Sequence, residues 1–234
     1  TSHRRRRRGA VTPEPPKFVS RAGIKLAHAL DVFKIDVGGF VCADLGCNVG
    51  GFTDCLLQRS AARVCALDTA YGVLDYRLRT DKRVTVRERT NALHAEPDED
   101  WLRACDLVVI DLGWTPQRLA LPAALPWLRP EVGRIISLIK PHYELGEVEK
   151  RELLVDGLLA RAEAERIVHR VLDSLHDLGV RSLGLTESPI AGGKSSRRVK
   201  RRRRAKADAN APTSGPADQL GNHEWLALLE PVNS

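Results

Sequence analysis

Four charged side chains stand at the ends of apolar segments, where a parallel sheet would gather them at one edge. They are Asp44, Asp68, Asp111 and Lys140, and each ends or directly follows a run of residues typical of a buried strand. Because the carboxyl ends of parallel strands share one rim of the sheet, these groups would surround a single crevice. Carboxylates and an amine in such a crevice can bind a polar ligand and move protons. The sequence therefore predicts a site that binds a ligand and does chemistry at this rim.

The first of these segments runs into a glycine-rich turn, with Gly46, Gly50 and Gly51 in the sequence DLGCNVGGF. This spacing differs from the G-x-G-x-x-G pattern that binds a dinucleotide, and it suits a nucleoside amino acid better. Asp68 follows about 20 residues after the first glycine, where an acidic side chain can accept the ribose hydroxyls of an adenosine. Together these features favour S-adenosylmethionine as the cofactor. The alternative is that the glycines only shape a tight turn and that Asp68 is solvated.

The candidate cofactor contacts are the residues of this turn and the polar residues at the strand ends. They are Asp44, Gly46, Asn48, Gly50, Gly51, Phe52, Asp68, Asn91 and Asp111. A turn role explains Asn91 equally well, and Cys47 either contacts the cofactor or belongs to the core. The five cysteines form no Cys-x-x-Cys pair, so we expect reduced core thiols and no metal site.

Lys140 follows the apolar sequence IISLI, and a charge at the end of a buried strand is costly unless it has a partner or a function. Desolvation and a nearby cation such as Lys25 would lower the pKa of Lys140 toward neutrality. Lys140 would then serve as a general base for a hydroxyl nucleophile, with Asp111 orienting its amine. The alternative is an ordinary salt bridge between Asp111 and Lys140 that closes two strand ends.

The net charge of +7 is distributed unevenly along the chain. Residues 1–17 carry +5, mainly from Arg4 to Arg8, and residues 191–222 carry +7, mainly between Lys194 and Lys206, which leaves −5 on the remainder. Two basic arms on an acidic body indicate a polyanionic partner, and beside a cofactor domain they favour nucleic acid. The sequence shows no secretory signal and no apolar run of the roughly 20 residues that span a bilayer. We therefore expect a soluble, cytoplasmic protein with no membrane partner.

Strand and helix patterns alternate along the chain and predict an α/β fold. The expected strands cover residues 40–45, 63–67, 84–89, 106–111, 133–140, 180–185 and 223–230, and the expected helices cover residues 21–33, 52–59, 116–128 and 149–178. This order predicts a Rossmann-like, mainly parallel seven-stranded sheet with helices on both faces and a last antiparallel strand. We expect a disordered basic arm at residues 1–17 and one domain at residues 18–234. A disordered basic insertion is expected at about residues 192–220 of that domain.

Seven segments resemble the FtsJ/TlyA-type RNA 2′-O-ribose methyltransferases, most closely the TlyA branch. They are SRAGIKL (20–26), DLGCNVGGFTDCLLQ (44–58), ERTNAL (88–93), VVIDLGWTPQRLALPAALPWLRP (108–130), LIKPHYE (138–144), SPI (188–190) and GNHEW (221–225). The resemblance implies a class I methyltransferase that uses S-adenosylmethionine to methylate structured RNA, such as ribosomal RNA. It also implies a catalytic tetrad, whose members match Lys25, Asp111, Lys140 and Glu224. Lys140 would take the proton of the 2′-hydroxyl, and Lys25 and Glu224 would tune or orient it.

This chain departs from the TlyA pattern in three places. We expect the small S4-type RNA-binding domain of that branch to be absent and the basic arms to replace it as an electrostatic anchor. Cys47 and Asn48 stand where small residues are usual, and LGWTP follows Asp111 where the branch has serine and phenylalanine. Trp114 in that segment could stack on an unpaired base or pack in the core.

Three other functions remain open at this point. The first is a catalytically silent protein of the same fold that binds RNA or ribosomes. The second is the membrane-damaging activity for which TlyA-like proteins are often named haemolysins, although no amphipathic or spanning segment supports it. The third is a base methyltransferase, which would not need two lysines around the acid.

Overall fold

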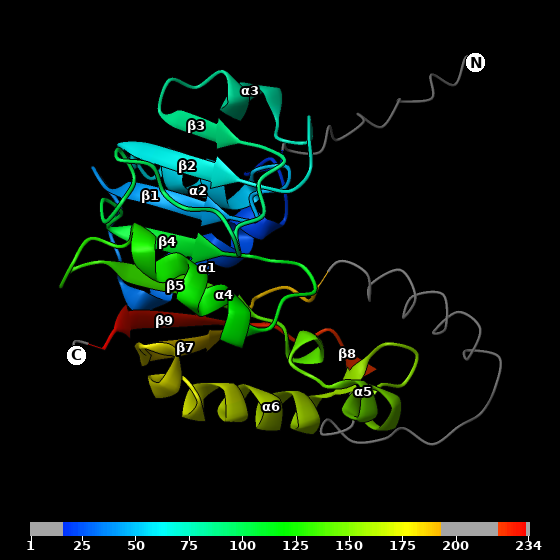
Figure 1. Cartoon of the computed structure of the whole chain (residues 1–234). Coiled ribbons are helices and arrows are strands. Elements are labelled where there is room, and N and C mark those ends of the chain that lie inside the picture. The colour runs from blue at the N-terminus through cyan, green and yellow to red at the C-terminus, as the bar shows by residue number, and fades with distance from the viewer. Residues whose placement is uncertain (1–15, 193–219, 233–234) are drawn as a thin grey trace, which may run out of the picture.

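A seven-stranded sheet forms the centre of the molecule, in a computed structural model that describes residues 16–192 and 220–232 (Figure 1). Its strand order is β3-β2-β1-β4-β5-β9-β7. The strands are β1 (Val41–Leu45), β2 (Arg63–Leu67), β3 (Val84–Arg87), β4 (Leu107–Ile110), β5 (Arg134–Ile139), β7 (Val180–Glu187) and β9 (Trp225–Pro231). β9 lies antiparallel to both of its neighbours, and every other pair is parallel. The predicted Rossmann-like sheet with its last antiparallel strand is confirmed.

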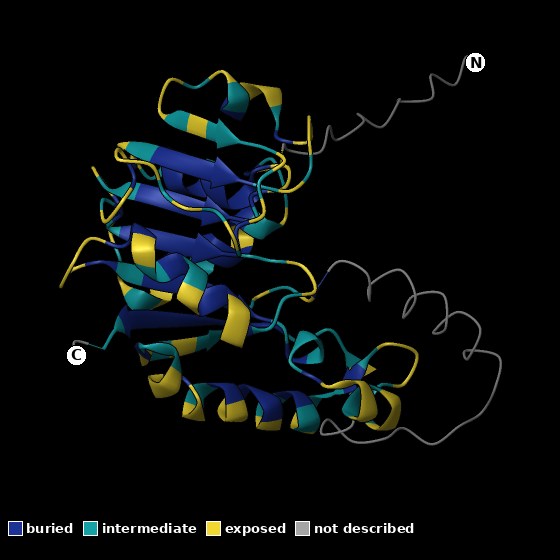
Figure 2. Cartoon of the chain, viewed as in Figure 1, coloured by how far each residue is buried: buried dark blue, intermediate teal, exposed yellow. Residues whose placement is uncertain are grey.

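Helices cover both faces of this sheet, as the layers in Figure 2 show. On one face, α1 (Ala22–Phe33) and α2 (Gly51–Gln58) pack on the central strands through residues that include Leu30 and Phe52. On the other face, α4 (Gln117–Ala124) and α6 (Arg161–Asp173) contribute residues such as Leu121 and Ile167. Successive strand residues point to opposite faces, so the continuous apolar runs of β1, β4 and β5 fill both cores.

The prediction of one long helix over residues 149–178 is wrong. The structure has α5 (Glu147–Leu153), a short strand β6 (Leu159–Ala160), α6 and a 3-10 turn (His176–Leu178) in its place. Asp156 and Gly157 have φ angles of 55° and 76°, which a helix cannot contain. They form the tip of a tight hairpin, in which the backbone N–H of Val155 and that of Leu158 each donate to the other's carbonyl at 2.9 and 3.0 Å. β6 then pairs with β8 (Leu220–Gly221), so tertiary pairing overrides the apolar spacing that continues only through α6.

Smaller deviations concern the ends of elements. The helix expected at residues 116–128 ends at Ala124 and continues as a 3-10 turn, Leu125–Trp127, which contains Pro126. α3 (Tyr76–Arg79) is a single short turn beside β3. All five cysteines are buried and free, as expected for core thiols.

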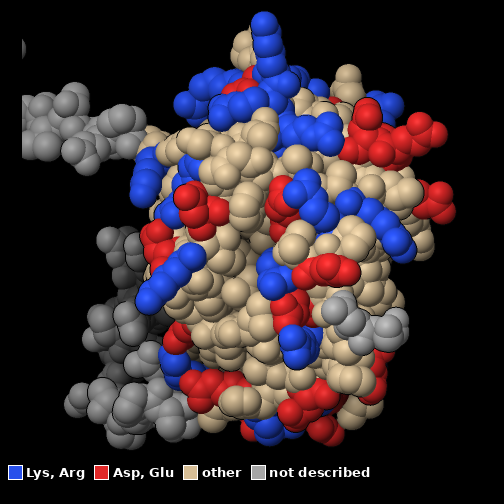
Figure 3. All heavy atoms as spheres, turned by 90° about the vertical axis from the view of Figure 1, so that its left-hand side faces the viewer, with Lys and Arg blue, Asp and Glu red and all other residues tan. Residues whose placement is uncertain are grey.

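The basic arms, Arg4 to Arg8 and Lys194 to Lys206, lie outside the described residues, so the predicted arm and insertion remain predictions. Within residues 16–192 and 220–232, no helix is both long and apolar enough to cross a membrane. In the same residues, no three His, Cys, Asp or Glu side chains cluster as metal ligands would. On the face shown in Figure 3, lysine and arginine gather at the top, over α3 and β3 in the orientation of Figure 1, and acidic and basic groups mix elsewhere.

Candidate active site

The glycine-rich turn brings the end of β1 close to the end of β4. Gly46 has a φ of 93°, and a Cβ atom built on it would lie 2.8 Å from the carbonyl oxygen of Asp111. Only glycine combines this conformation with this approach. The backbone N–H groups of Gly46 and Cys47 donate to the carbonyl of Leu67 at 2.9 Å, which fastens the turn to the end of β2. At Gly51, a side chain would collide with Ser20 before α1, so this glycine packs α2 against the start of α1.

Asp44 is completely buried below the turn. Its Oδ2 atom accepts hydrogen bonds from the Thr53 backbone N–H at 2.9 Å and from the Thr53 hydroxyl at 2.7 Å. Its Oδ1 atom is buried without a hydrogen-bond partner among the described residues. Burial raises the pKa of Asp44 to about 7, although the bonds from Thr53 act in the opposite direction. An acceptor of this kind, on the wall of a pocket, is suited to a ligand that donates a hydrogen bond or carries positive charge.

Asp68 and Asn91, the two residues predicted to meet the nucleoside, also shape the loops around the turn. The Asp68 carboxylate accepts hydrogen bonds from the backbone N–H groups of Asn48 and Ala70, both at 2.8 Å. The Asn91 side chain is exposed and accepts from the backbone N–H of Leu93 at 3.0 Å, as in a turn. Each carboxylate oxygen of Asp68 retains a second lone pair for a ligand hydroxyl.

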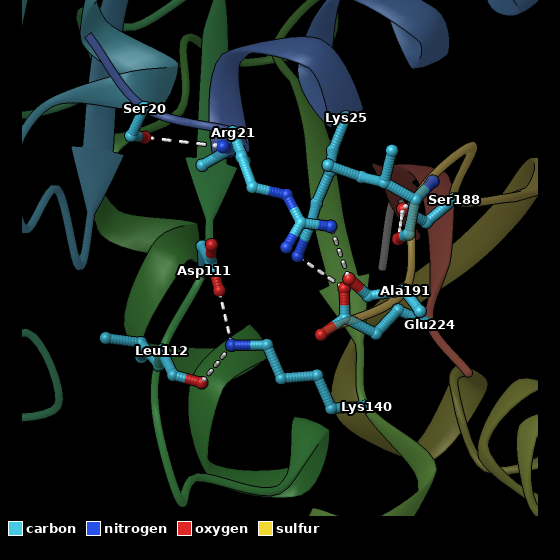
Figure 4. Close-up of polar contacts among 11 residues, drawn as sticks. Ser20, Arg21, Lys25, Asp111, Leu112, Lys140, Ser188, Ala191 and Glu224 are labelled. Atoms are coloured by element: carbon cyan, nitrogen blue, oxygen red, sulfur yellow. Dashed lines mark hydrogen bonds and ion pairs between the residues drawn. The ribbon is translucent and has the colours of Figure 1, made fainter. Parts of the chain in front are cut away.

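Two lysine–carboxylate ion pairs face one another across the rim of the sheet (Figure 4). Lys140 at the end of β5 pairs with Asp111 at the end of β4, and its Nζ atom also donates to the carbonyl of Leu112 at 3.3 Å. Lys25 from α1 pairs with Glu224, which precedes β9. Lys25 and Glu224 are only 8% and 4% exposed, so both charges depend on each other for compensation. The structure thus brings together all four residues that the resemblance implied.

The expected lowering of the Lys140 pKa is not found. Burial lowers the pKa of Lys140, but the Asp111 carboxylate in contact with the amine raises it by more, and Glu224 adds a smaller increase. The net pKa of Lys140 therefore lies above its ordinary value. The predicted lowering is wrong because the direct contact with the Asp111 carboxylate outweighs burial. The pKa of Glu224 is also raised, but here burial is the cause, and it acts against the lowering effect of Lys25.

Glu224 is fixed in place by the chain segments that flank it. The backbone N–H of Ser188 donates to the Glu224 carbonyl at 2.8 Å, and the backbone N–H of Gly192 donates to the Asn222 carbonyl at 3.1 Å. A Cβ atom on Gly192 would lie 2.6 Å from Oε1 of Glu224. The guanidinium of Arg21 donates to the Ala191 carbonyl at 3.0 Å and ties the same segment to the start of α1. Residues 188–192 therefore form a tight backing for the Lys25–Glu224 pair.

A pocket of about 910 Å³ joins the glycine turn to both ion pairs. Its lining includes most of the predicted site residues, namely Lys25, Asp44, Gly46, Asn48, Phe52, Asp111, Lys140 and Glu224. Gly50, Gly51, Asp68 and Asn91 are not in direct contact with this space, so their cofactor roles remain predictions. The far wall consists of residues from α5 and the following hairpin, which were not predicted: Lys150, Leu154, Asp156, Gly157 and Leu158. The Asp-Gly dipeptide in this wall is a common hairpin signal and could have identified the turn.

Two aromatic side chains form another part of the wall. Trp114 is 75% exposed, with a φ of 58°, and its ring centroid lies 5.0 Å from that of Tyr143. The Nζ atom of Lys140 lies over the Tyr143 ring, 5.4 Å from its centroid. Exposure on this scale excludes the core-packing alternative for Trp114. Tyr143 was missed, although its place three residues after Lys140 in a motif segment was a signal.

Comparisons with known proteins agree with this geometry. A model of the FtsJ-like methyltransferase family matches residues 18–199. The 16S/23S rRNA (cytidine-2'-O)-methyltransferase TlyA of Mycobacterium tuberculosis is 39% identical over 183 residues, which cover 78% of this chain and 66% of that protein. Hemolysin A of Brachyspira hyodysenteriae is 34% identical over 77% of this chain and 74% of its own length. A solved structure of a candidate hemolysin from Streptococcus thermophilus aligns with a TM-score of 0.76 and 32% identity, covering 95% of this chain and 70% of that one.

This chain spans about two thirds of the length of the first of these relatives. The family match covers most of the chain and includes three of the four residues of the two ion pairs, and the solved relative shares the fold. The protein therefore belongs to the FtsJ-like methyltransferase family.

Proposed function

We propose that this protein transfers a methyl group from S-adenosylmethionine to the 2′-hydroxyl of a ribose in structured RNA, with ribosomal RNA as its substrate. The observation that carries the proposal is the pairing of Lys140 with Asp111 and of Lys25 with Glu224 on the wall of one pocket that begins at a glycine turn. The buried Lys25 and the partly buried Lys140, on either side of Asp111, suit the handling of a hydroxyl proton. The relatives named as rRNA (cytidine-2'-O)-methyltransferases support the same substrate class. Such a substrate would place the protein in the cytoplasm.

The residues present fit S-adenosylmethionine. The Oδ1 atom of Asp44, which has no hydrogen-bond partner among the described residues, offers an acceptor to its ammonium group, and Gly46 lets the turn approach Asp111 closely at the pocket wall. Asn48 lies on the pocket wall, and Asp68 at the end of β2 retains lone pairs for ribose hydroxyls. When bound, the cofactor would supply an electrophilic methyl group and a sulfonium charge.

Lys140 acts in this proposal as the general base. In the state described here its pKa is raised and the ammonium form dominates, so only the small neutral fraction can accept the 2′-hydroxyl proton. Positive charge that enters the pocket beside Asp111 opposes the ammonium form and increases that fraction. Asp111 and the Leu112 carbonyl hold the amine in place, and the Lys25–Glu224 pair fixes the opposite wall.

The RNA would enter from the outer part of the pocket. Trp114 presents an exposed ring on which an unpaired base can stack, next to Tyr143 and Lys140. The segment from Lys194 to Lys206 follows directly after Gly192 at the pocket wall and would contribute charge that attracts phosphates. Arg4 to Arg8 would add a second electrostatic contact.

The test is transfer of labelled methyl from S-adenosylmethionine to ribosomal subunits and to naked ribosomal RNA. We expect the wild type to form a dinucleotide that resists alkaline hydrolysis, as a 2′-O-methyl group requires. Lys140→Ala should lose at least about 10²-fold in rate, because general-base catalysis contributes on this order. Lys82→Ala removes an exposed lysine outside the pocket and should retain the wild-type rate.

Other outcomes identify the competing functions. RNA binding and cofactor binding without any transfer would indicate a catalytically silent RNA-binding protein. Transfer to an alkali-labile product would indicate a base methyltransferase, and leakage from liposomes would indicate a membrane activity.

A further inference from the structure

Beyond β4 and β5, the two chain segments that carry Asp111 and Lys140 diverge. Residues 111–116 lead into α4, and residues 141–145 form a 3-10 turn (Pro141–Tyr143) and its exit. The sheet register pairs Ile110 with Ser137 and ends there, so the strands alone do not fix the loops. A link between the loops is needed to hold the acceptors of the Lys140 amine.

Glu144 provides this link. Both of its carboxylate oxygens lie within hydrogen-bond distance of the backbone N–H of Gln117, at 2.9 and 3.2 Å. Gln117 is the first residue of α4, and the preceding Pro116 makes no side-chain cap. The carboxylate therefore satisfies a free donor at the helix N-terminus from a distant segment, and its charge complements the helix dipole.

The Gln117 side chain extends the same connection to β5. Its Nε2 atom donates to the Leu138 carbonyl at 3.3 Å, and its Oε1 atom accepts from the Ser137 hydroxyl at 2.6 Å. Gln117 and Ser137 are 4% and 0% exposed, so this network is enclosed by protein. Cooperative networks of this kind are rigid when every member is satisfied.

We propose that Glu144 is a positioning residue that holds the Asp111–Leu112 segment on the Lys140 amine through the N-terminus of α4. Without it, the first turn of α4 loses its acceptor and the loop at residues 112–116 loosens. The Leu112 carbonyl then moves away from Lys140, and the contact with Asp111 weakens. Burial raises the pKa of Glu144 to about 7, against the lowering effects of the bond from Gln117 and of the cations Arg170 on α6 and Arg118 on α4. Both arginines are unchanged in variants of Glu144.

The direct readout is the titration of Lys140, which does not depend on enzyme activity. Asp111 raises the pKa of Lys140 and burial lowers it, so a weaker contact must shift the pKa down. In Glu144→Ala, we expect competitive labelling with acetic anhydride at pH 9 to modify Lys140 at least about threefold faster than in the wild type, since each unit of pKa changes the neutral fraction about tenfold.

A matched control separates this effect from the loss of any helix cap. Asp75 caps α3, beside the edge strand β3, by accepting a hydrogen bond from the backbone N–H of Arg77 at 2.9 Å. Asp75→Ala removes a helix cap in another part of the fold and should therefore leave the labelling of Lys140 unchanged. Glu144→Gln retains an oxygen acceptor but loses the charge, so it should show a smaller shift in the same direction, and it carries the test if Glu144→Ala does not fold. An unchanged Lys140 titration in the folded variants would overturn the inference.

The catalytic consequence rests on the proposed function. Methyl transfer by Glu144→Ala should fall about tenfold in kcat, with the affinity for S-adenosylmethionine unchanged and partial rescue in Glu144→Gln. A wild type without transfer activity would contradict the proposed function, while the labelling of Lys140 would still decide the role of Glu144. If Glu144→Ala has a normal kcat but faster labelling of Lys140, Glu144 affects only the pKa of the Lys140 amine. That result would overturn its role in the reaction.

Discussion

The buried carboxylate Asp44 makes the stability of the cofactor-free protein depend on pH. Its pKa is about 7 in the folded protein against an ordinary value of 3.8, so the folded state holds a proton that the unfolded state releases between these values. Unfolding then releases a proton, and stability falls as the pH rises through this window. One unit of pKa shift corresponds to about 1.4 kcal/mol, so between pH 5 and pH 8 the charge on Asp44 lowers the free energy of unfolding by about 3 kcal/mol.

The variant Asp44→Asn isolates this contribution. An amide oxygen can still accept both hydrogen bonds from Thr53, and the side chain carries no charge at any pH. Glu144 and Glu224 also have raised pKa values, but they are present in both proteins and cancel in the difference. We expect the variant to gain about 3 kcal/mol relative to the wild type between pH 5 and pH 8, or roughly 6–12 °C in Tm.

Urea denaturation at several pH values, without cofactor, measures this difference. Parallel stability curves for the two proteins would refute the reasoning, because they would mean that Asp44 is not desolvated in the folded state. A gain with the opposite pH dependence would mean that a cation compensates Asp44. Adding S-adenosylmethionine should flatten the wild-type curve, since its ammonium group would favour the charged carboxylate.

Two glycine substitutions test the close contacts of the site, each against a control glycine that matches it in having or lacking a left-handed φ but has more room for a side chain. Gly192→Ala places a methyl group 2.6 Å from Oε1 of Glu224, so the rate of methyl transfer should fall about tenfold while the affinity for the cofactor is retained. In the control Gly146→Ala, the added methyl group has no atom closer than 3.9 Å, and the rate should not change. Equal rates in the two variants would contradict the positioning of Glu224. Gly46→Ala combines a φ of 93° with a Cβ atom 2.8 Å from the Asp111 carbonyl oxygen, so the affinity for the cofactor, measured by calorimetry, should fall at least about tenfold. Gly72→Ala has a φ of 71° but no atom within 4 Å of the added methyl group, and it should retain most of the affinity.

Much of the site could be predicted because parallel strands impose their own geometry. Asp111 and Lys140 end adjacent strands, so a correct list of strands suffices to bring them together at one rim. Lys25 and Glu224 differ, since one comes from a helix and the other precedes an antiparallel strand far along the chain. No local pattern places them together, and only the resemblance to a family did so.

The failures have a common physical cause, which is that they depend on contacts between distant segments. The direction of the Lys140 pKa shift depends on how closely a carboxylate approaches the amine, and a sequence does not contain this distance. The helix over residues 149–178 was expected from apolar spacing that is genuine in α6. The helix begins only at Arg161, because the strand that follows the hairpin around Gly157, β6, pairs with β8 about 60 residues later in the chain.

The two ion pairs are anchored in different ways, and this difference indicates how substrate would act on each. The Lys140–Asp111 pair belongs to the sheet, and its spacing is set by adjacent strands and the α4 network. The Lys25–Glu224 pair joins α1 to a segment whose backing, Gly192 and Asn222, leads directly into the basic stretch of residues 193–219. If the proposed function holds, RNA bound by that stretch would be tethered beside Glu224, and its reacting ribose would lie at Lys140. The Lys25–Glu224 pair would then adjoin the electrostatic binding of RNA, and the Lys140–Asp111 pair would supply the fixed geometry of proton transfer.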